Sequence, residues 1–226
     1  LNNMGYILPS FFENISKISN REMPKVLIET GTFKGGLAHR YLESLGSIDP
    51  FSKIYTFELG ENISRIASKR FKLFDQYSGD TSKFNFHTDE EDLDFNKSGT
   101  YYYNTIELIN SDSVEGLKKL LPSIEEPCCF WLDAHAGAAK YARGPKDVPL
   151  LDELDIIANH HIKNHIIAID DVHMFGKIQY HNKTNEQICD YSFVTEDSVF
   201  EKLKNINNQY KIEYHEPYGH LLLISY

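Results

Sequence analysis

The feature that most constrains the fold is the alternation of short apolar runs with helix-length amphipathic stretches. Five runs are typical of buried parallel strands, namely Lys25–Thr30, Lys53–Leu59, Thr105–Asn110, Cys128–Asp133 and His165–Asp170. Apolar residues at helical spacing predict helices over residues 36–45, 61–74, 111–124, 149–162 and 195–208. Tyr210–His215 and His220–Ser225, around "EPYG", predict a closing hairpin. This order indicates an α/β fold with helical crossovers.

The length of 226 residues suits one α/β domain covering residues 1–226. Asp75–Asn104 is polar and too long for an ordinary connection, so we interpret it as an insertion or lid. Gly137–Val148 and Gly176–Phe193 are also long, and both follow strands that end in aspartate, where open α/β sheets bind ligands. The chain begins with Leu1 rather than Met, so we expect trimming or excision from a longer, multidomain polypeptide.

Charge and composition narrow the class of protein. The formal net charge is −10, with 33 acidic against 23 basic residues, which disfavours binding to nucleic acid. No apolar run reaches the length of a membrane span, so we expect no membrane partner. The three cysteines have neither disulfide nor zinc spacing, and this favours a reducing, cytoplasmic compartment.

A glycine-rich turn, "ETGTFKGG", follows the first strand. Glycine has no Cβ, so such a turn lets the backbone approach a ligand closely. Glu29 would repel a pyrophosphate but could accept a hydrogen bond from an ammonium group, and Phe33 replaces the middle glycine of the dinucleotide motif. We therefore expect a ligand with an amino-acid end at Glu29, Gly31, Thr32, Gly35 and Gly36. A tight strand-to-helix turn without a ligand is the alternative.

Polar residues also end the second and third strands. Glu58 ends the second, where a carboxylate can accept hydrogen bonds from ribose hydroxyls. Asp112 and Ser113 follow the third, where they could contact adenine or, equally well, cap the next helix. A ligand with an amino-acid end and a ribose, such as S-adenosylmethionine, suits this set.

Three carboxylates follow the fourth and fifth strands. Asp133 closes "FWLD", and Asp170 and Asp171 close "IIAIDD". A histidine comes two residues after each group, His135 after Asp133 and His173 after Asp171. The carboxyl ends of parallel strands lie at one edge of a sheet, so we expect these side chains to lie together.

From about Lys25 to Tyr226 the sequence resembles the class I S-adenosylmethionine-dependent methyltransferases, on the glycine turn, Glu58 and the three aspartates. The resemblance implies a Rossmann-like three-layer sandwich with a seven-stranded sheet, in the order 3-2-1-4-5-7-6, with strand 7 antiparallel. Within that family the aspartates match the metal-dependent O-methyltransferases that act on macrolide sugars and catechols. They imply that Asp133, Asp170 and Asp171 hold Mg²⁺ or another divalent cation, with Asp133 also contacting the donor.

The resemblance further implies methylation of a hydroxyl group, most readily that of a sugar in a glycan or glycosylated metabolite. An enzyme of this kind must align the hydroxyl with the donor methyl group and remove a proton. His135 is our first choice for the base and His173 the second. The catechol enzymes use a lysine in this region, and Lys140 lies somewhat further along.

Three other functions stay open. A catechol-type enzyme acting on a small molecule would use the same residues. A metal-dependent nucleotide-sugar glycosyltransferase would explain the aspartates but not Glu29. A non-catalytic interaction domain predicts a broken aspartate set, which the sequence does not show.

Other polar groups suggest structural roles. Asp152, Glu153 and Asp155 lie near a helix start, where we expect solvated or capping carboxylates. His160 and His161 suit the end of the same helix better than a metal site.

Overall fold

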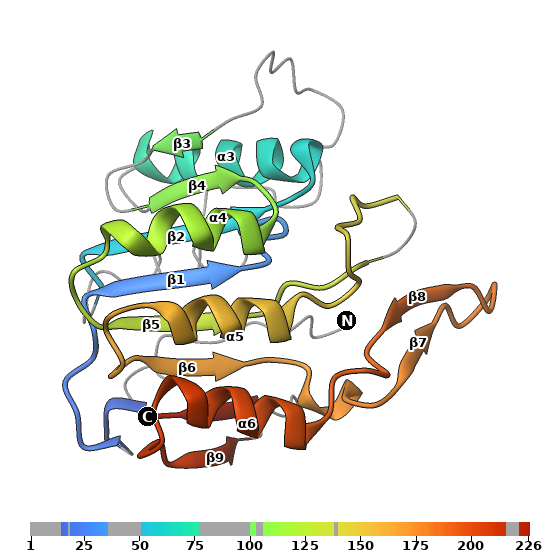
Figure 1. Ribbon diagram of the computed structural model, residues 1–226. Helices are drawn as coiled ribbons and strands as arrows, with labels where there is room; N and C mark the ends of the chain where they lie inside the picture. The colour runs from blue at the N-terminus through green and yellow to red at the C-terminus, as the bar shows by residue number, and fades with distance from the viewer. Residues whose placement is uncertain are drawn as a thin grey trace.

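The computed structural model describes residues 15–17, 19–35, 51–76, 100–102, 106–137, 140–215 and 222–226. Within these residues the main sheet has eight strands in the order β3-β4-β2-β1-β5-β6-β10-β9 (Figure 1). The strands are β1 (Val26–Thr30), β2 (Lys53–Glu58), β3 (Thr100–Tyr102), β4 (Ile106–Asn110), β5 (Cys128–Leu132), β6 (Ile166–Ile169), β9 (Ile212–His215) and β10 (Leu222–Ser225). The described α-helices are α3 (Glu61–Gln76), α4 (Ser113–Leu120), α5 (Leu150–Asn159) and α6 (Glu196–Ile206).

The predicted strand order is confirmed, with one addition. β4, β2, β1, β5 and β6 are parallel neighbours, and β10 lies antiparallel between β6 and β9. These seven strands reproduce the order 3-2-1-4-5-7-6. The eighth, β3, pairs antiparallel with the outer edge of β4 and was not predicted.

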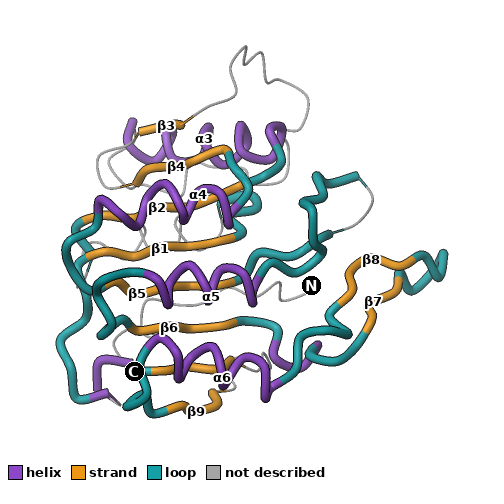
Figure 2. The backbone as a smooth tube through the Cα atoms, viewed as in Figure 1, coloured by secondary structure: helices purple, strands orange, loops and turns teal. Residues whose placement is uncertain are grey.

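The sheet lies between two helical layers, as Figures 1 and 2 show. Its central strands are apolar on both faces, because alternate residues of each strand point to opposite sides. Val26 and Ile28 of β1 pack in the core beneath α4, α5 and α6, whereas Leu27 packs in the core beneath α3. This two-sided burial explains why the strands have continuous apolar sequences rather than alternating ones.

Two predicted segments lie wholly or mostly outside the described residues. These are the helix over residues 36–45 and the insertion over residues 75–104, of which only the end of α3 and β3 are described. The connection Gly176–Phe193, by contrast, contains a second sheet, an antiparallel hairpin of β7 (Ile178–Tyr180) and β8 (Gln187–Asp190). The hairpin projects beyond the carboxyl ends of the main strands (Figure 1). No helix among the described residues is long and apolar enough to cross a membrane.

Candidate active site

A cavity of about 490 Å³ opens at the carboxyl ends of the central strands. It brings together ten of the predicted site residues, namely Glu29, Gly31, Thr32, Glu58, Asp112, Ser113, Asp133, His135, Asp170 and Asp171. Gly35 and His173 do not line it, and Gly36 lies outside the described residues. The cavity lies where the chain order turns back, between β1 and β5, which is the usual ligand position in such sheets.

The glycine turn is fixed to the neighbouring strands by its backbone. The amides of Gly31 and Thr32 both donate to the carbonyl oxygen of Phe57, at 3.1 and 3.0 Å. Gly31 has φ +84°, and a Cβ there would lie 2.5 Å from the carbonyl oxygen of Asp133. Gly35 has φ +78° and packs against the ring of Phe71 in α3. The absence of a Cβ at Gly31 therefore allows the ends of β1 and β5 to lie side by side. The absence of a Cβ at Gly35 allows the turn to pack against α3.

Glu58 holds the turn from the end of β2. Its two carboxylate oxygens accept hydrogen bonds from the backbone amides of Phe33, at 2.8 Å, and Gly60, at 2.7 Å. Phe33 takes a left-handed conformation, with φ +49°, which is uncommon for an aromatic residue. Burial raises the pKa of Glu58 to about 7, although both amide hydrogen bonds oppose the shift.

Glu29 is almost fully buried at the end of β1. It accepts a hydrogen bond from the hydroxyl of Thr56, which also bonds the hydroxyl of Thr32. Burial raises the pKa of Glu29 to about 8, against the opposing effect of Thr56. This chain of side chains ties the glycine turn to both β1 and β2.

Asp112 caps a helix, as one of the two interpretations of the sequence predicted, and it also lines the cavity. One oxygen, Oδ1, accepts a hydrogen bond from the amide of Glu115 at 3.2 Å and so caps α4. The residue also lines the cavity beside Ser113, and a Cβ on Gly144 would lie 3.3 Å from Oδ2. The loop that contains Gly144 therefore passes over this end of the cavity.

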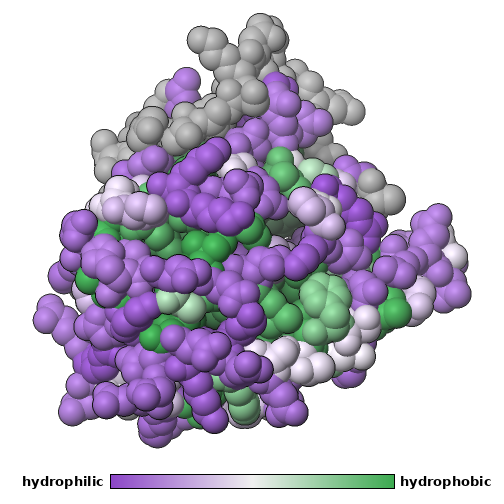
Figure 3. All heavy atoms as spheres, in the orientation of Figure 1, coloured by the Kyte–Doolittle hydropathy of each residue, from purple (hydrophilic) through white to green (hydrophobic). Residues whose placement is uncertain are grey.

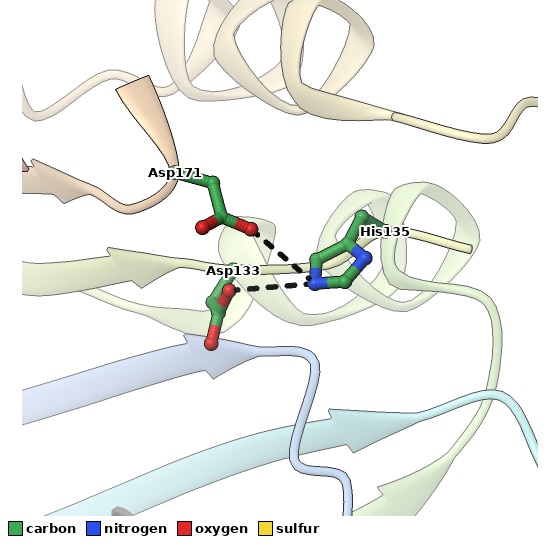
Figure 4. A group of neighbouring side chains, drawn as sticks. All are labelled: Asp133, His135 and Asp171. Carbon is green, nitrogen blue, oxygen red and sulfur yellow. Dashed lines mark ion pairs between the residues drawn. The ribbon is translucent and has the colours of Figure 1, made fainter. Parts of the chain in front are cut away.

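At the other end of the cavity, Asp133, His135 and Asp171 converge (Figure 4). Nε2 of His135 lies 3.5 Å from Oδ2 of Asp171 and 4.0 Å from Oδ1 of Asp133. Nδ1 of the same ring lies 2.9 Å from the carbonyl oxygen of Ala136 and can donate its proton there. In that tautomer the lone pair of Nε2 faces the two carboxylates.

Asp170 and Asp171 have different roles in this cluster. Asp170 is 7% exposed, and its Oδ1 accepts a hydrogen bond from the amide of Asp171 at 2.7 Å. Asp171 has φ +56°, and its Oδ2 accepts a hydrogen bond from the hydroxyl of Tyr191 at 3.2 Å. The ligand atoms that lie within 4.8 Å of one another belong to Asp133, His135 and Asp171, whereas the predicted metal set had Asp170 in place of the histidine.

The pKa values of Asp133 and His135 are shifted because several carboxyl groups lie close together. Burial, followed by the charges of Asp170 and Asp171, raises the pKa of Asp133 well above its usual range. Burial alone would lower the pKa of His135, but a hydrogen bond with Cys189 and the charge of Asp171 raise it to about 9. A cationic group in this position would therefore be stabilised by its surroundings.

The other two candidates for the base lie away from the centre. Nδ1 of His173 is 3.9 Å from Oδ1 of Asp171, but the side chain is 49% exposed and does not line the cavity. Lys140 lies with its Nζ 5.2 Å from the ring centre of Tyr141 and does not line the cavity. His135 is the better placed of the three.

Several lining residues were missed in the sequence. The rings of Phe33 and Tyr141 meet edge to face at the glycine turn, with centres 5.4 Å apart. Gln179 of β7 also lines the cavity. Tyr141 and Gln179 lie in long connections, where neither periodicity nor a motif gives a signal. Phe33 stood inside the glycine turn, and its edge contact depends on a loop more than one hundred residues further along.

One structural expectation was wrong and another was incomplete. Asp152 and Asp155 pair with Lys146 and Lys202 at the surface, as expected, but Glu153 is 1% exposed and burial raises its pKa to about 7. Helix α5 turns this carboxyl towards the sheet, because Glu153 lies on the same side as buried Leu150, Leu154 and Ile157. His160 is the C-terminal cap of α5, as expected, but it is also buried.

Comparison with known proteins shows that the chain shares its fold with solved structures. No protein-family model matches the chain, and no curated protein matches it. Solved structures do: a candidate caffeoyl-CoA O-methyltransferase from Staphylococcus aureus shares 12% identity with a TM-score of 0.51, over 99% of this chain and 86% of that one.

Two further structures have the same TM-score of 0.51. The O-methyltransferase from Bacillus cereus, in complex with S-adenosylhomocysteine, shares 10% identity over 97% of this chain and 81% of that one. A candidate rRNA methylase from Clostridium thermocellum shares 12% identity over 97% of both chains. Likeness at this level of identity confirms the predicted Rossmann-like fold.

Proposed function

We propose that this protein is an S-adenosylmethionine-dependent, divalent-metal-assisted O-methyltransferase that acts on a hydroxyl group of a sugar, in a glycan or glycosylated metabolite. One observation carries the proposal. A single cavity has the glycine turn with Glu29 and Glu58 at one end and the cluster of Asp133, His135 and Asp171 at the other. The first set suits a donor with an amino-acid end and a ribose, and the second suits a hydroxyl acceptor.

At the donor end, each residue has a separate task. Glu58 faces the position of a ribose, where carboxylate oxygens can accept hydrogen bonds from its hydroxyls. Glu29 lies behind the turn, at the end of β1, where its carboxyl favours an ammonium group. Gly31 keeps the backbone free of a Cβ next to Asp133, so the donor can lie against both strand ends. The rings of Phe33 and Tyr141 line this end of the cavity.

The residues at the acceptor end fit a divalent cation. Carboxylate oxygens of Asp133 and Asp171 lie within 4.8 Å of each other, and hard divalent ions prefer oxygen ligands of this kind, which leaves the nearby imidazole of His135 free for another role. Asp133 and Asp171 would hold the ion, with Asp170 behind them. A bound ion would supply positive charge that lowers the pKa of an acceptor hydroxyl and of the neighbouring imidazolium.

The reaction also needs a general base that takes the proton of the acceptor hydroxyl, and we assign this role to His135. Its Nδ1 proton is directed at the carbonyl oxygen of Ala136, so Nε2 is the nitrogen that accepts the proton of the acceptor hydroxyl. The hydroxyl oxygen then attacks the donor methyl carbon, and the bond from that carbon to sulfur breaks. Methyl transfer of this kind depends mainly on alignment, and binding at the two ends of one cavity would bring the acceptor hydroxyl and the donor methyl group together.

Titration of S-adenosylhomocysteine tests the donor site directly. We expect micromolar binding, about −8 kcal/mol, weakened at least about tenfold in Glu58→Gln because a neutral amide is a poorer acceptor for ribose hydroxyls. Glu115→Gln is the matched control, since Glu115 is an exposed glutamate outside the cavity. No binding to the unchanged protein, together with binding of a nucleotide diphosphate sugar, would instead support a glycosyltransferase.

A further inference from the structure

The segment at the end of β8 brings two buried side chains to the acceptor end of the cavity. Cys189 of β8 is fully buried and hydrogen-bonds His135. Tyr191, two residues further along, is 3% exposed, and its hydroxyl donates a hydrogen bond to Oδ2 of Asp171 at 3.2 Å. One short segment therefore contacts both the proposed base and a proposed metal ligand.

The backbone around Tyr191 is fixed at the base of the β7–β8 hairpin. Its amide donates to the carbonyl oxygen of Lys177 at 2.9 Å. Its carbonyl oxygen accepts hydrogen bonds from the amides of Gly176, at 3.1 Å, and Val194, at 2.9 Å. The side chain belongs to the larger hydrophobic core, together with Val194. The phenol ring is therefore held from both sides, and its hydroxyl is the polar end that reaches the site.

Further bonds join the hairpin to the loop after β5. Arg143 donates two hydrogen bonds to Asp147, both at 2.9 Å, and a third to the carbonyl oxygen of Ile188 at 2.6 Å. Asp147 also accepts a hydrogen bond from the amide of Asp190 at 3.0 Å. In Figure 3 the hairpin, at the right edge of the molecule, is coloured mostly hydrophilic. Polar bonds at its base therefore contribute to fixing its position against the cavity.

Asp171 has an uncommon backbone conformation and a single hydrogen-bond donor to its side chain. Its φ is +56°, and its amide donates to Oδ1 of Asp170 at 2.7 Å. That bond fixes the backbone but not the rotation of the carboxylate. Within the described part of the chain, the hydroxyl of Tyr191 is the one hydrogen-bond donor to this carboxylate. The orientation of the carboxylate therefore depends on Tyr191.

Two histidines lie near the same carboxylate without forming a hydrogen bond to it. Nε2 of His135 is 3.5 Å from Oδ2 (Figure 4), and Nδ1 of His173 is 3.9 Å from Oδ1. A turn of the carboxylate towards either ring would shorten one of these distances and move an oxygen away from Asp133. A carboxylate has about four lone-pair sites, so Oδ2 can accept from Tyr191 and still bind a cation. The bond from Tyr191 thus opposes a turn that would separate the two metal ligands.

We infer that Tyr191 is a positioning residue of the metal site, whose hydroxyl holds Asp171 in the orientation that binds a divalent cation. The inference rests on the proposed function, which assigns the ion to Asp133 and Asp171. Hydrogen bonds that orient a ligating carboxylate raise the affinity for the metal, because the ligand is already in place when the ion binds. Tyr191 does not line the cavity, so it acts through Asp171 rather than by contact with the acceptor.

Binding of Mn²⁺ to the protein saturated with S-adenosylhomocysteine tests the inference, because electron paramagnetic resonance measures the free ion directly. Tyr191→Phe removes the hydroxyl and keeps the ring. We expect this variant to bind Mn²⁺ about tenfold to one hundredfold more weakly than the unchanged protein. Its affinity for S-adenosylhomocysteine, measured with a chelator and without Mn²⁺, should stay the same, because Glu29 and Glu58 at the donor end belong to β1 and β2.

Tyr214→Phe is the matched control. Tyr214 also donates its hydroxyl to a carboxylate, that of Glu196 at 2.6 Å, but neither residue lines the cavity. We expect this variant to bind Mn²⁺ as the unchanged protein does. Saturation with S-adenosylhomocysteine stabilises the folded state by mass action, so a moderate loss of stability in Tyr191→Phe does not prevent the titration.

The outcomes separate this inference from the proposed function. Equal affinity for Mn²⁺ in the unchanged protein and in Tyr191→Phe would overturn the inference and leave the proposed function intact. Equal losses in the Tyr191 and Tyr214 variants would also overturn it. So would a loss of S-adenosylhomocysteine binding in Tyr191→Phe, because it would show a general structural role. If the unchanged protein binds S-adenosylhomocysteine but no Mn²⁺, the metal assistance of the proposed function fails, and the inference fails with it.

Discussion

Gly31 shows how one residue allows the end of β1 to lie close to Asp133, at the end of β5. Its φ of +84° is accessible to glycine at little cost, and any Cβ would overlap the backbone of Asp133 at 2.5 Å. The neighbouring atoms are backbone, which cannot move aside as a flexible side chain could. The glycine is therefore needed for packing as well as for conformation.

Gly31→Ala should cost about 2 to 5 kcal/mol of unfolding free energy, since the left-handed conformation and the overlap both contribute. Gly176→Ala is the matched control, because Gly176 has φ +73° but nothing within 4 Å of its added Cβ, so only the conformational cost of about 1 to 2 kcal/mol remains. Urea unfolding of both variants measures the difference. Equal costs would show that the close approach to Asp133 is not important.

At the same scale, the sequence predicted which residue types would meet but not how they would meet. Asp133 and Asp171 were identified because carboxylates at the ends of neighbouring parallel strands must lie close together. The place of His135 in the ligand group depends on a hydrogen bond from Nδ1 to the next carbonyl oxygen, and that of Asp170 on its bond to the amide of Asp171. Such local bonds follow from backbone angles that no sequence pattern specifies.

Among the elements, the strands were easier to predict than the short hairpin. β1, β5 and β6 are buried on both faces, so their sequences are continuously apolar and easy to recognise. β7 has three residues, two of them exposed, and β8 has four, so neither produces an apolar run. Tertiary contacts with the loop after β5 stabilise this hairpin, which is why the sequence of the segment alone did not reveal it.

The end of α5 and the start of β6 are joined by two buried histidines. The amide of Cys128 donates to Nδ1 of His165 at 3.0 Å, so the proton of that ring is on Nε2, which lies 3.1 Å from Nδ1 of His160. Nε2 of His160 then donates to the carbonyl oxygen of Ile124 at 3.0 Å. Every nitrogen has a partner only while both rings are neutral.

This arrangement predicts a loss of stability in mild acid. Burial, followed by the neighbouring His160, lowers the pKa of His165 to about 3 in the folded protein, against about 6.5 in the unfolded chain. As the pH falls below about 6.5, the unfolded chain binds a proton that the folded protein does not, so stability falls. From pH 7 to pH 5 the loss from this residue is about 2 kcal/mol.

His165→Gln tests this prediction, because glutamine can accept from Cys128 and donate to His160 without titrating. We expect the unfolding free energy of the unchanged protein to fall more steeply than that of the variant between pH 7 and pH 5. Parallel curves would show that His165 does not remain neutral in the folded state. Other titrating groups are common to both proteins and cancel in the comparison.

For the whole molecule, the order of the strands determines what meets at the cavity. The chain leaves β1 towards β2 and β4 on one side and later returns to build β5 and β6 on the other. The glycine turn after β1 and Glu58 at the end of β2 therefore line the same cavity as Asp133 and Asp171, which follow β5 and β6. The alternation of strands and helices predicted the α/β class, and the strand order was predictable because the resemblance to the class I methyltransferases implied it.

The central claim is that a donor molecule and a divalent ion bind side by side in this one cavity. Paramagnetic Mn²⁺ tests it most directly, because it accelerates the relaxation of nearby protons on S-adenosylhomocysteine when both are bound to the protein. We expect the protons next to the sulfur to relax faster than those of the adenine. The effect should disappear in Asp171→Asn and persist in Asp155→Asn, a surface change at an aspartate paired with Lys202. Unchanged relaxation with both ligands bound, or an effect that survives Asp171→Asn, would contradict the claim.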